Sequence, residues 1–398
     1  MTIRNINSVI AGLSPYKPGK PIEELSRELG LTDIVKLASN ENPFGASRKV
    51  KEALVSAVDE LTRYPDGSGF ALKRALSEKL KVESSQITLG NGSNDVLDLI
   101  ARATMESDSE GIISEHSFVV YGLAIKCAGG RAVVVPALNY GCDLQAMSLA
   151  VTDKTRVIYI ANPNNPTGTW VTDQELKRFL DSVPPNVWIV LDEAYFEYVA
   201  DSEYPHGLEL QTKYPNLIVT RTFSKAYGLA ALRVGYSVSS AEFADILNRV
   251  RQPFNVNSLA LAAALSALDD QEFIQTSVRA NEIGMAQICS GLDQLNLKVI
   301  PSAGNFVSFD TGQSEIEIFN RLLSKGVIVR PIAEYGLPGF VRELRSVWSP
   351  KMRVFWRHSA KCYEANYHHR GWIHWCLFSQ LNKEVKNLRA IGWYRTEF

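Results

Sequence analysis

A lysine and an arginine that follow one apolar run are the residues whose types and spacing best support covalent chemistry. Lys225 comes two residues after the end of the run Asn216–Phe223, and Arg233 lies eight residues beyond Lys225. A lysine amine can form a Schiff base with an aldehyde, and a nearby guanidinium offers a rigid fork of donors for a phosphate. A plain surface lysine is the ordinary alternative, but the arginine favours a phosphorylated aldehyde as the bound group.

The segment that contains this pair resembles the lysine motif of fold-type I aminotransferases, which use pyridoxal phosphate (PLP). The matching residues are Ser224-Lys225-Ala226-Tyr227-Gly228 and Arg233-Val234-Gly235-Tyr236. The resemblance implies that Lys225 holds PLP, that Arg233 binds its phosphate, and that Thr222 and Ser224 belong to the same site.

An acid and a tyrosine end an earlier apolar run. Asp192 and Tyr195 follow Val190-Leu191. A buried carboxylate raises the pKa of a pyridine nitrogen beside it, which keeps PLP protonated and able to withdraw electrons. Tyr195 could donate a hydrogen bond to the phenolic oxygen of PLP and lower the pKa of the Schiff base. The alternative is that Asp192 merely caps the next helix.

Three further segments resemble the family's cofactor contacts. Asn165 stands before Pro166-Thr167-Gly168, where the family's asparagine bonds the phenolic oxygen. The glycine-rich segment Leu89–Asp95 precedes a helix expected at 96–105, and the free N–H groups of a helix start suit a phosphate. The resemblance assigns that phosphate to Gly92, Ser93 and Asn94. Tyr121 stands where an aromatic ring stacks on PLP, although His116 replaces the proline usual before this run.

A narrower resemblance, to histidinol-phosphate aminotransferase, covers residues 8 to 342. It rests on Gly12–Gly19, Leu37–Gly45 and Arg63–Gly67. The resemblance implies that Tyr64 crosses a dimer interface to the partner's cofactor phosphate and that the enzyme is a homodimer. It also implies substrate contacts at Tyr16, Asn42, Arg330 and Arg342, with Arg342 at the carboxylate-binding position.

The implied reaction is transamination between L-histidinol phosphate and 2-oxoglutarate in histidine biosynthesis, with a phosphorylated amino alcohol and a 2-oxo acid as small-molecule partners. Two alternatives stay open, because relatives with nearly the same motifs act on aromatic amino acids or decarboxylate threonine phosphate. The decarboxylase would be a lyase that releases carbon dioxide and needs no 2-oxo acid.

The elements that must position these residues alternate between short β-rich runs and helical patterns from about residue 80 to 240. This alternation is typical of a mostly parallel sheet sandwiched by helices, in which ligands bind beyond the carboxyl ends of the strands. We therefore predict an α/β fold: an N-terminal arm at 1–45, a large PLP-binding domain at 46–245 and a smaller α+β domain at 246–342. The resemblance implies the fold-type I PLP-transferase architecture.

Composition is that of a globular protein acting on small molecules. The chain has 398 residues, 45% of them hydrophobic, and a net charge of -1. This charge argues against nucleic acid or an anionic membrane as a partner. The longest apolar run, at 259–268, is about half of the roughly 20 residues that a membrane span needs. We expect a cytoplasmic protein, with its cysteines reduced.

The family resemblance stops near Arg342, where composition changes. Residues 343–398 hold five of the seven Trp and four of the six His. The tail can be translated in a shifted reading frame, in which each codon starts at the third base of the preceding one. In that frame the genetic code requires a leucine across Phe355-Trp356. The frame also allows a leucine-rich helix over 350–363, followed by a stop codon. We predict that a single-nucleotide slip produced this tail and that the chain as written is poorly stable, or even inactive. A rival metal site would use Cys362, His368, His369, His374 and Cys376, but these spacings match no familiar zinc pattern, and no metal is expected.

Overall fold

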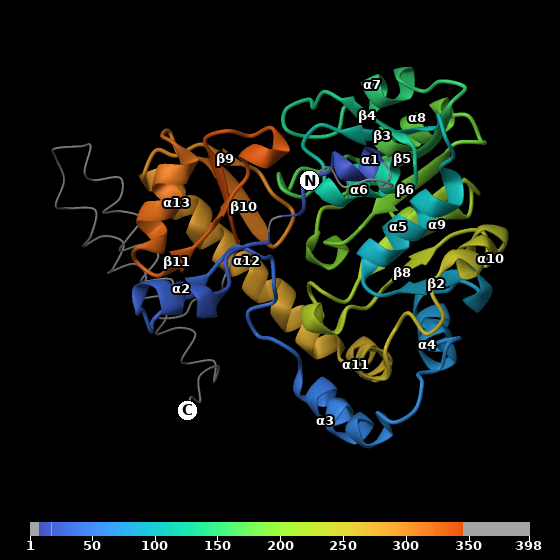
Figure 1. Ribbon diagram of the computed structural model, residues 1–398, viewed down its shortest axis with the longest axis horizontal. Helices are drawn as coiled ribbons and strands as arrows, with labels where there is room; N and C mark the ends of the chain where they lie inside the picture. The colour runs from blue at the N-terminus through green and yellow to red at the C-terminus, as the bar shows by residue number, and fades with distance from the viewer. Residues whose placement is uncertain (1–7, 17, 345–398) are drawn as a thin grey trace.

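The computed structural model describes residues 8–16 and 18–344. A large seven-stranded sheet forms the centre of one unit, and a smaller antiparallel sheet lies beside it (Figure 1). The large sheet has the order β2-β8-β7-β6-β5-β3-β4, and only β8 runs antiparallel to its neighbours. Its strands are β2 (Ile87–Gly90), β3 (Glu110–Ser114), β4 (Arg131–Val135), β5 (Thr155–Ala161), β6 (Trp188–Asp192), β7 (Leu217–Thr222) and β8 (Gly235–Val238).

Helices cover both faces of this sheet because successive strand side chains point to opposite sides. Val157, Val190 and Ile218 face a core formed with α5 (Ser93–Thr104), α6 (Val119–Cys127) and α10 (Ala241–Val250). Their neighbours Ile158, Ile189 and Val219 face α7 (Leu144–Leu149), α8 (Asp173–Ser182) and α9 (Gly207–Gln211) on the other side. The sheet is therefore apolar on both faces, and its polar residues gather at the strand ends.

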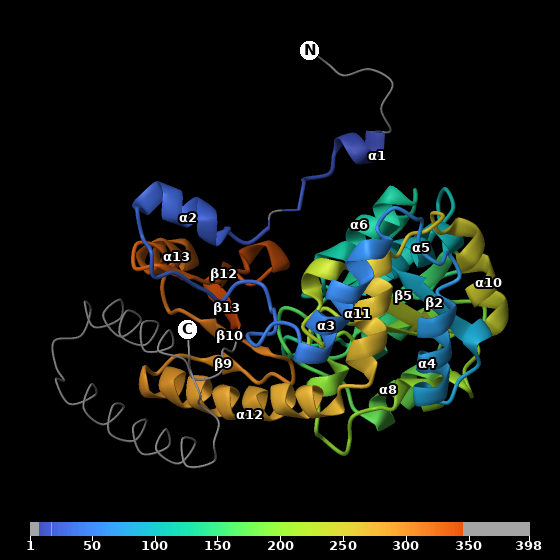
Figure 2. The same ribbon diagram turned by 90° about the horizontal axis from the view of Figure 1, so that it is seen from below.

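The smaller sheet has the order β12-β13-β10-β9 and is antiparallel. Its strands are β9 (Val299–Ile300), β10 (Phe306–Asp310), β12 (Arg330–Pro331) and β13 (Phe340–Leu344), flanked by α13 (Glu315–Leu323). The long helix α12 (Gln271–Gln294) runs from the large unit to this sheet (Figure 2). Near the N-terminus, β1 (Val35–Lys36) pairs in parallel with β11 (Val327–Ile328), so the start of the chain joins the smaller unit.

The remaining helices are α1 (Ser8–Ala11), α2 (Ile22–Leu29), α3 (Arg48–Ala57), α4 (Phe70–Leu80) and α11 (Ser258–Leu268), with short 3-10 turns η1 (Val58–Glu60), η2 (Ser84–Gln86), η3 (Phe196–Tyr198), η4 (Ala230–Leu232) and η5 (Ala333–Tyr335). Helix α11 contains the longest apolar run and packs against α3 and α4. Helix α1 projects beyond the large unit (Figure 2). No helix among the described residues is long and apolar enough to cross a membrane.

The predicted fold class is confirmed, and the β-rich runs expected between about residues 80 and 240 form the strands of the large sheet. The helix expected at 96–105 begins earlier, at Ser93, because Gly92 supplies the left-handed N-cap, with φ at 84°. The expected domain limits at 45, 245 and 342 stay predictions. The expected frame-shifted tail and the rival Cys and His metal site lie almost entirely outside the described residues, beyond Leu344.

Candidate active site

The carboxyl ends of parallel strands meet at one edge of the large sheet, and a cavity of about 210 Å³ opens there against the smaller unit. Most of the predicted site residues line it, although they come from segments far apart in the sequence. They are Tyr16, Ser93, Asn94, Tyr121, Asn165, Asp192, Tyr195, Thr222, Ser224, Lys225, Arg233, Arg330 and Arg342.

Lys225 follows β7 and is largely buried in this cavity. Burial, together with the cations Arg342 and Arg233, lowers the pKa of its amine to about 8, against the opposing effect of Glu41. Its Nζ lies 5.6 Å from the centroid of the Tyr195 ring. The unprotonated amine, which is the form that attacks a carbonyl, is therefore a minor form at neutral pH but far more abundant than in an ordinary lysine.

Asp192, at the end of β6, is 5% exposed. Two neutral hydroxyls hold its carboxylate: Tyr121 donates to Oδ2 at 2.7 Å and Thr220 donates to Oδ1 at 2.9 Å. Burial raises the pKa of Asp192, although both hydrogen bonds oppose that shift. Among the described residues no lysine or arginine forms an ion pair with it. The carboxylate is thus oriented but is not neutralised by the chain itself.

The start of helix α5 and Arg233 form a cradle for an anion. Ser93 and Asn94 open the helix at the cavity, and Arg233 Nη1 donates to Ser224 Oγ at 3.3 Å. A Cβ on Gly92 would lie 2.4 Å from Arg233 Nη2, so the guanidinium reaches this place only because residue 92 is glycine. Helix N–H groups beside a guanidinium suit a phosphate.

Asn165 and Arg342 are in direct contact, because Arg342 Nη1 donates to Asn165 Oδ1. Arg342 Nη2 also donates to the Ala38 carbonyl at 3.1 Å. On the same side of the cavity, Asn40 Nδ2 donates to the Tyr195 hydroxyl at 2.9 Å. Burial raises the pKa of Tyr195 to about 12, so the phenol keeps its proton. The groups predicted for a phenolic oxygen and for a carboxylate therefore lie together.

Arg330 lies at the outer part of the cavity. Its guanidinium carbon is 5.4 Å from the centroid of the Tyr16 ring, and Nη2 forms an ion pair with Glu334. Since Arg342 lines the same cavity, the site has two guanidinium groups with which to bind a substrate that carries two anionic groups.

Three predicted residues do not line this cavity: Asn42, Tyr64 and Gly92, which lies against Arg233. Asn42 Nδ2 donates to the Ala226 carbonyl at 2.8 Å and to Ser277 Oγ at 3.0 Å, so the amide braces the backbone beside Lys225. Tyr64 is 82% exposed and stacks on Phe254, with ring centroids 4.8 Å apart. The substrate role of Asn42 and the cofactor role of Tyr64 stay predictions.

Three residues of the site were missed from the sequence. Thr220 holds Asp192, Asn40 holds Tyr195, and Tyr335 lines the cavity beside Arg330. Thr220 could have been found from strand alternation, because it precedes Thr222 by two positions and shares its face. Asn40 lies in the same short segment as Asn42, but Tyr335 carries no comparable signal.

Known proteins share this arrangement. Residues 32–343 match the family model of class I and II aminotransferases. The chain is 57% identical over 332 residues to histidinol-phosphate aminotransferase 2 of Pseudomonas fluorescens, and the match covers 83% of this chain and 90% of that protein. Its identity to histidinol-phosphate aminotransferase 2 of Pseudomonas aeruginosa is 56%, with the same coverage.

A solved structure agrees with these relatives. The histidinol-phosphate aminotransferase of Sinorhizobium meliloti, in complex with PLP, superposes with a TM-score of 0.83 at 28% identity, covering 92% of this chain and 99% of that one. The family match and the similarity to the Pseudomonas proteins each extend over most of this chain. The chain therefore belongs to the class I and II aminotransferase family.

Proposed function

We propose that this chain is a PLP-dependent aminotransferase that transfers an amino group from L-histidinol phosphate to 2-oxoglutarate. The observation that carries the proposal is the convergence of Lys225, Asp192 and Arg233 on one cavity that also holds Arg330 and Arg342. The relatives that are more than half identical to the chain are histidinol-phosphate aminotransferases, which favours this substrate over aromatic amino acids and over decarboxylation of threonine phosphate.

The residues present fit PLP. Arg233 and the N-terminus of α5 would hold the phosphate in the cradle that a side chain at Gly92 would fill. Asp192, oriented by two hydroxyls, would bind the protonated pyridine nitrogen, and Asn165 and Tyr195 would donate to the phenolic oxygen. Tyr121 is fully buried and lines the cavity, where it would cover the ring. Bound there, PLP supplies an electron sink for the carbanion formed at the substrate α-carbon.

Lys225 would serve as the proton carrier of the reaction. Because the pKa of its amine is lowered to about 8, Nζ can take a proton from the substrate α-carbon and deliver it to the cofactor without a large change in free energy. Tyr195, whose pKa is raised, keeps its proton and remains a hydrogen-bond donor throughout. Asp192 would place its carboxylate against the ring nitrogen.

The two arginines account for the two substrates. Arg342 is the deeper of the two, in contact with Asn165, and would bind the carboxylate of 2-oxoglutarate or glutamate. Arg330, with the Tyr16 ring beside it, would bind the phosphate monoester at the outer end. To accept that phosphate, Arg330 has to exchange its ion pair with Glu334 for one with the substrate.

A second copy of the chain would complete the site. Five large apolar side chains on α3, η1, α4 and their connections are exposed: Val55, Val58, Leu61, Tyr64 and Phe70. Phe254, between α10 and α11, is exposed as well and stacks on Tyr64. A patch of this kind marks an interface. We place the partner subunit on it, with Tyr64 reaching the partner's cofactor phosphate. We also propose a cytoplasmic location, in keeping with the free thiols of Cys127 and Cys142.

One spectroscopic experiment tests the proposed function. Purified holoprotein is mixed with L-glutamate, and the absorbance of lysine-bound PLP should give way to that of pyridoxamine phosphate. L-histidinol phosphate should produce the same change at lower concentration than phenylalanine. Carbon dioxide release from threonine phosphate, without any need for a 2-oxo acid, would instead identify a decarboxylase.

A further inference from the structure

Tyr64 belongs to a loop whose tyrosine does not line the cavity of its own subunit. The loop, residues 64–69, connects η1 to α4, and the side chain of Tyr64 is outside the cavity and 82% exposed. Its ring stacks on Phe254 at an interplanar angle of 20°. Phe254 itself is 44% exposed and has a φ of +57°, a conformation that L-residues rarely adopt. Contacts with neighbouring residues must therefore hold the rings of Tyr64 and Phe254 in this arrangement.

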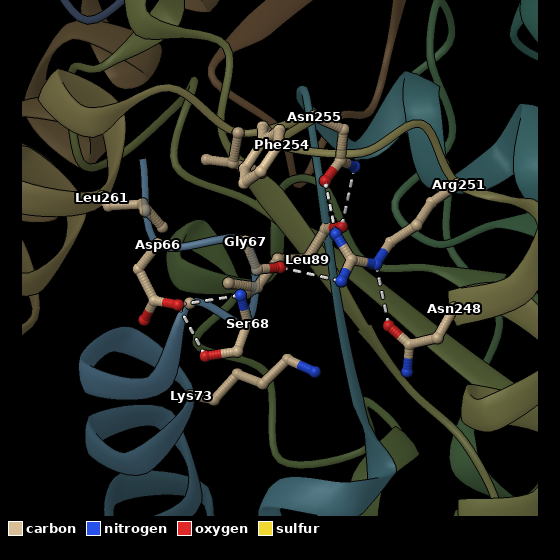
Figure 3. Close-up of a pocket in the computed structure, with 12 residues that line it drawn as sticks. Asp66, Gly67, Ser68, Lys73, Leu89, Asn248, Arg251, Phe254, Asn255 and Leu261 are labelled. Carbon is tan, nitrogen blue, oxygen red and sulfur yellow. Dashed lines mark hydrogen bonds between the residues drawn. The ribbon is translucent and has the colours of Figure 1, made fainter. Parts of the chain in front are cut away.

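Arg251 lies beside this loop and donates from all three of its nitrogen atoms (Figure 3). Nη2 donates to the Gly67 carbonyl at 2.8 Å. Nη1 donates to Asn255 Oδ1 at 3.2 Å, and Nε donates to Asn248 Oδ1 at 2.9 Å. Among the described residues no carboxylate forms an ion pair with Arg251. The guanidinium therefore fixes the positions of a backbone carbonyl and two side-chain amides. Its planar set of donors suits this role.

Asn255 extends this connection to the anion cradle. Its Nδ2 donates to the Leu89 carbonyl at 3.1 Å and to Asp95 Oδ2 at 2.9 Å. The same Asp95 oxygen accepts from the Asn91 backbone N–H at 2.8 Å. Leu89, Asn91 and Asp95 flank Ser93 at the start of α5. Two side chains, Arg251 and Asn255, thus join the Tyr64 loop to the chain's own phosphate-binding segment.

The close approach of the loop to Phe254 depends on Gly67. A Cβ at this position would lie 3.2 Å from two carbons of the Phe254 ring. The Gly67 carbonyl, in turn, is the acceptor for Arg251. The ring of Phe254 therefore lies between the backbone that Arg251 holds and the tyrosine that it supports.

We infer that Arg251 is a positioning residue for the active site of the partner subunit: it holds the loop so that Tyr64 meets the partner's cofactor phosphate. The inference rests on the proposed dimer and deepens it. Arg251 acts through Tyr64, so it affects the active site of the partner subunit, whose lysine belongs to that subunit. Through Asn255, the same residue also links that contribution to the phosphate segment of its own site.

The first test measures PLP affinity by equilibrium dialysis, with three variants and a control. Tyr64→Phe removes a hydrogen bond to a charged group and should weaken binding by about tenfold to a hundredfold. Arg251→Ala should weaken it by about tenfold, and so should Phe254→Ala, which alters only an exposed side chain. Arg249→Ala is the matched control, because Arg249 lies two residues earlier, in the last turn of α10, in an exposed pair with Asp245. Unchanged affinity in Arg251→Ala and Phe254→Ala would overturn the inference.

The second test places the effect in one subunit or the other. Lys225→Ala chains and Arg251→Ala chains are co-expressed with different tags, and the mixed dimer is isolated. One of its two sites then has Lys225 from the Arg251→Ala chain and the intact loop from the other chain. We expect that site to bind PLP with parental affinity, read from the absorbance of lysine-bound PLP, and to give half the parental activity.

The same mixture made with Tyr64→Phe separates the two proposals. In one outcome, the Lys225→Ala chain rescues the Tyr64→Phe chain but fails to rescue the Arg251→Ala chain. That result would support the proposed dimeric site and contradict the role of Arg251. If Tyr64→Phe is not rescued either, Tyr64 does not act across the interface and the proposed dimeric site fails first. Rescue of both variants supports the inference.

Discussion

Two groups of buried charges lie on opposite faces of the same two strands, β6 and β7, and they differ in how completely the chain balances them. Asp192 and Thr220 face the cavity, whereas the adjacent residues Glu193 and Arg221 face the other way, as strand alternation requires. One residue along the chain therefore separates a site for a ligand from a structural ion pair.

On the face away from the cavity, Arg221 and Glu193 form an ion pair in which the two charges balance. Arg221 donates from Nε to Glu193 Oε2 at 2.8 Å, and its Nη2 lies 2.7 Å from the same oxygen. The guanidinium also lies 3.7 Å from the centroid of the Phe196 ring. Nearby, burial raises the pKa of Glu197 to about 7, against the attraction of Arg221. The opposite charges of Arg221 and Glu193 thus balance without any outside group.

On the cavity face, Asp192 and Lys225 do not form ion pairs that balance their charges in this way with any described residue. Asp192 is held by neutral hydroxyls, and Lys225 has the cations Arg342 and Arg233 as neighbours. Burying charges without opposite partners costs free energy, which a protein can recover when a ligand of complementary charge binds. An anionic phosphate and a protonated pyridine nitrogen would supply the missing charges. The difference between the two faces shows how binding sites can be told from structural ion pairs by their balance of charge.

Removing Lys225 should have the largest effect on activity. Lys225→Ala takes away the amine that binds PLP and carries the proton, so no turnover should be measurable. Borohydride reduction of the parent protein should fix PLP to the peptide that contains Lys225. A reduced adduct on any other lysine would show that Lys225 is not the residue that binds PLP.

Asp192→Ala should lower the rate of transamination by roughly a thousandfold, because the positive charge on the ring nitrogen loses its partner. The folding stability should change little, since Asp192 has no charged partner to lose. Steady-state kinetics and thermal unfolding measure the two effects. A rate within tenfold of the parent would mean that Asp192 only caps the chain after β6.

Arg221→Met should show the reverse pattern. It leaves the Glu193 carboxylate buried without a cation, so the free energy of unfolding should fall by about 3–5 kcal/mol while the turnover number of the folded protein changes little. Urea unfolding measures the loss. The double variant Arg221→Met/Glu193→Leu should recover most of it, and a double variant as unstable as the single one would contradict the idea of a closed pair.

Glu343 offers a smaller test, because it is a buried charge that belongs to neither face. It lies on β13, paired with Val307 and two residues from Val341 in the core of the smaller unit. It is 0% exposed, and neither carboxylate oxygen has a hydrogen-bond partner among the described residues. Burial therefore raises its pKa well above the usual value.

Glu343→Val should stabilise the protein by about 1–3 kcal/mol at pH 8 and by less at pH 5. The sign follows from the raised pKa: between the unfolded and folded values the folded state binds the extra proton, so stability falls as the pH rises, and the valine removes this loss. Urea unfolding at both pH values measures it. Glu282→Gln, an exposed carboxylate on α12, is the control; equal gains at the two pH values would contradict the explanation.

Glu343 is also where the family resemblance ends, and we maintain the proposal that a single-nucleotide slip near Arg342 and Glu343 changed the reading frame. Sequencing the gene again should restore an apolar residue after Arg342 and a stop near position 363. An intact present frame through Phe398, with a stable and active product of 44.2 kDa, would show instead that the tail is genuine.

Much of the fold and of the site could be predicted from the sequence. Each strand of the large sheet is a short β-rich run, and the polar residues after these runs became the lining of the cavity. Local patterns were sufficient because strand runs and helix patterns depend on neighbouring residues, and because parallel strands necessarily bring their carboxyl ends to one edge. Lys225 and Asp192 were found after such runs, Arg233 was found from its spacing to Lys225, and the resemblance to the family gave the three residues their roles.

Contacts between distant segments were decided only by the tertiary structure. The sequence does not show that Arg342 meets Asn165, that Asn40 rather than Asn42 reaches the Tyr195 hydroxyl, or that Arg251 holds the Tyr64 loop. It also does not show that Glu193 is closed in a pair while Asp192 stays open, since both are acids in one short run. These outcomes depend on which side chains meet when the sheet and the smaller unit come together, and no local pattern in the chain contains that information.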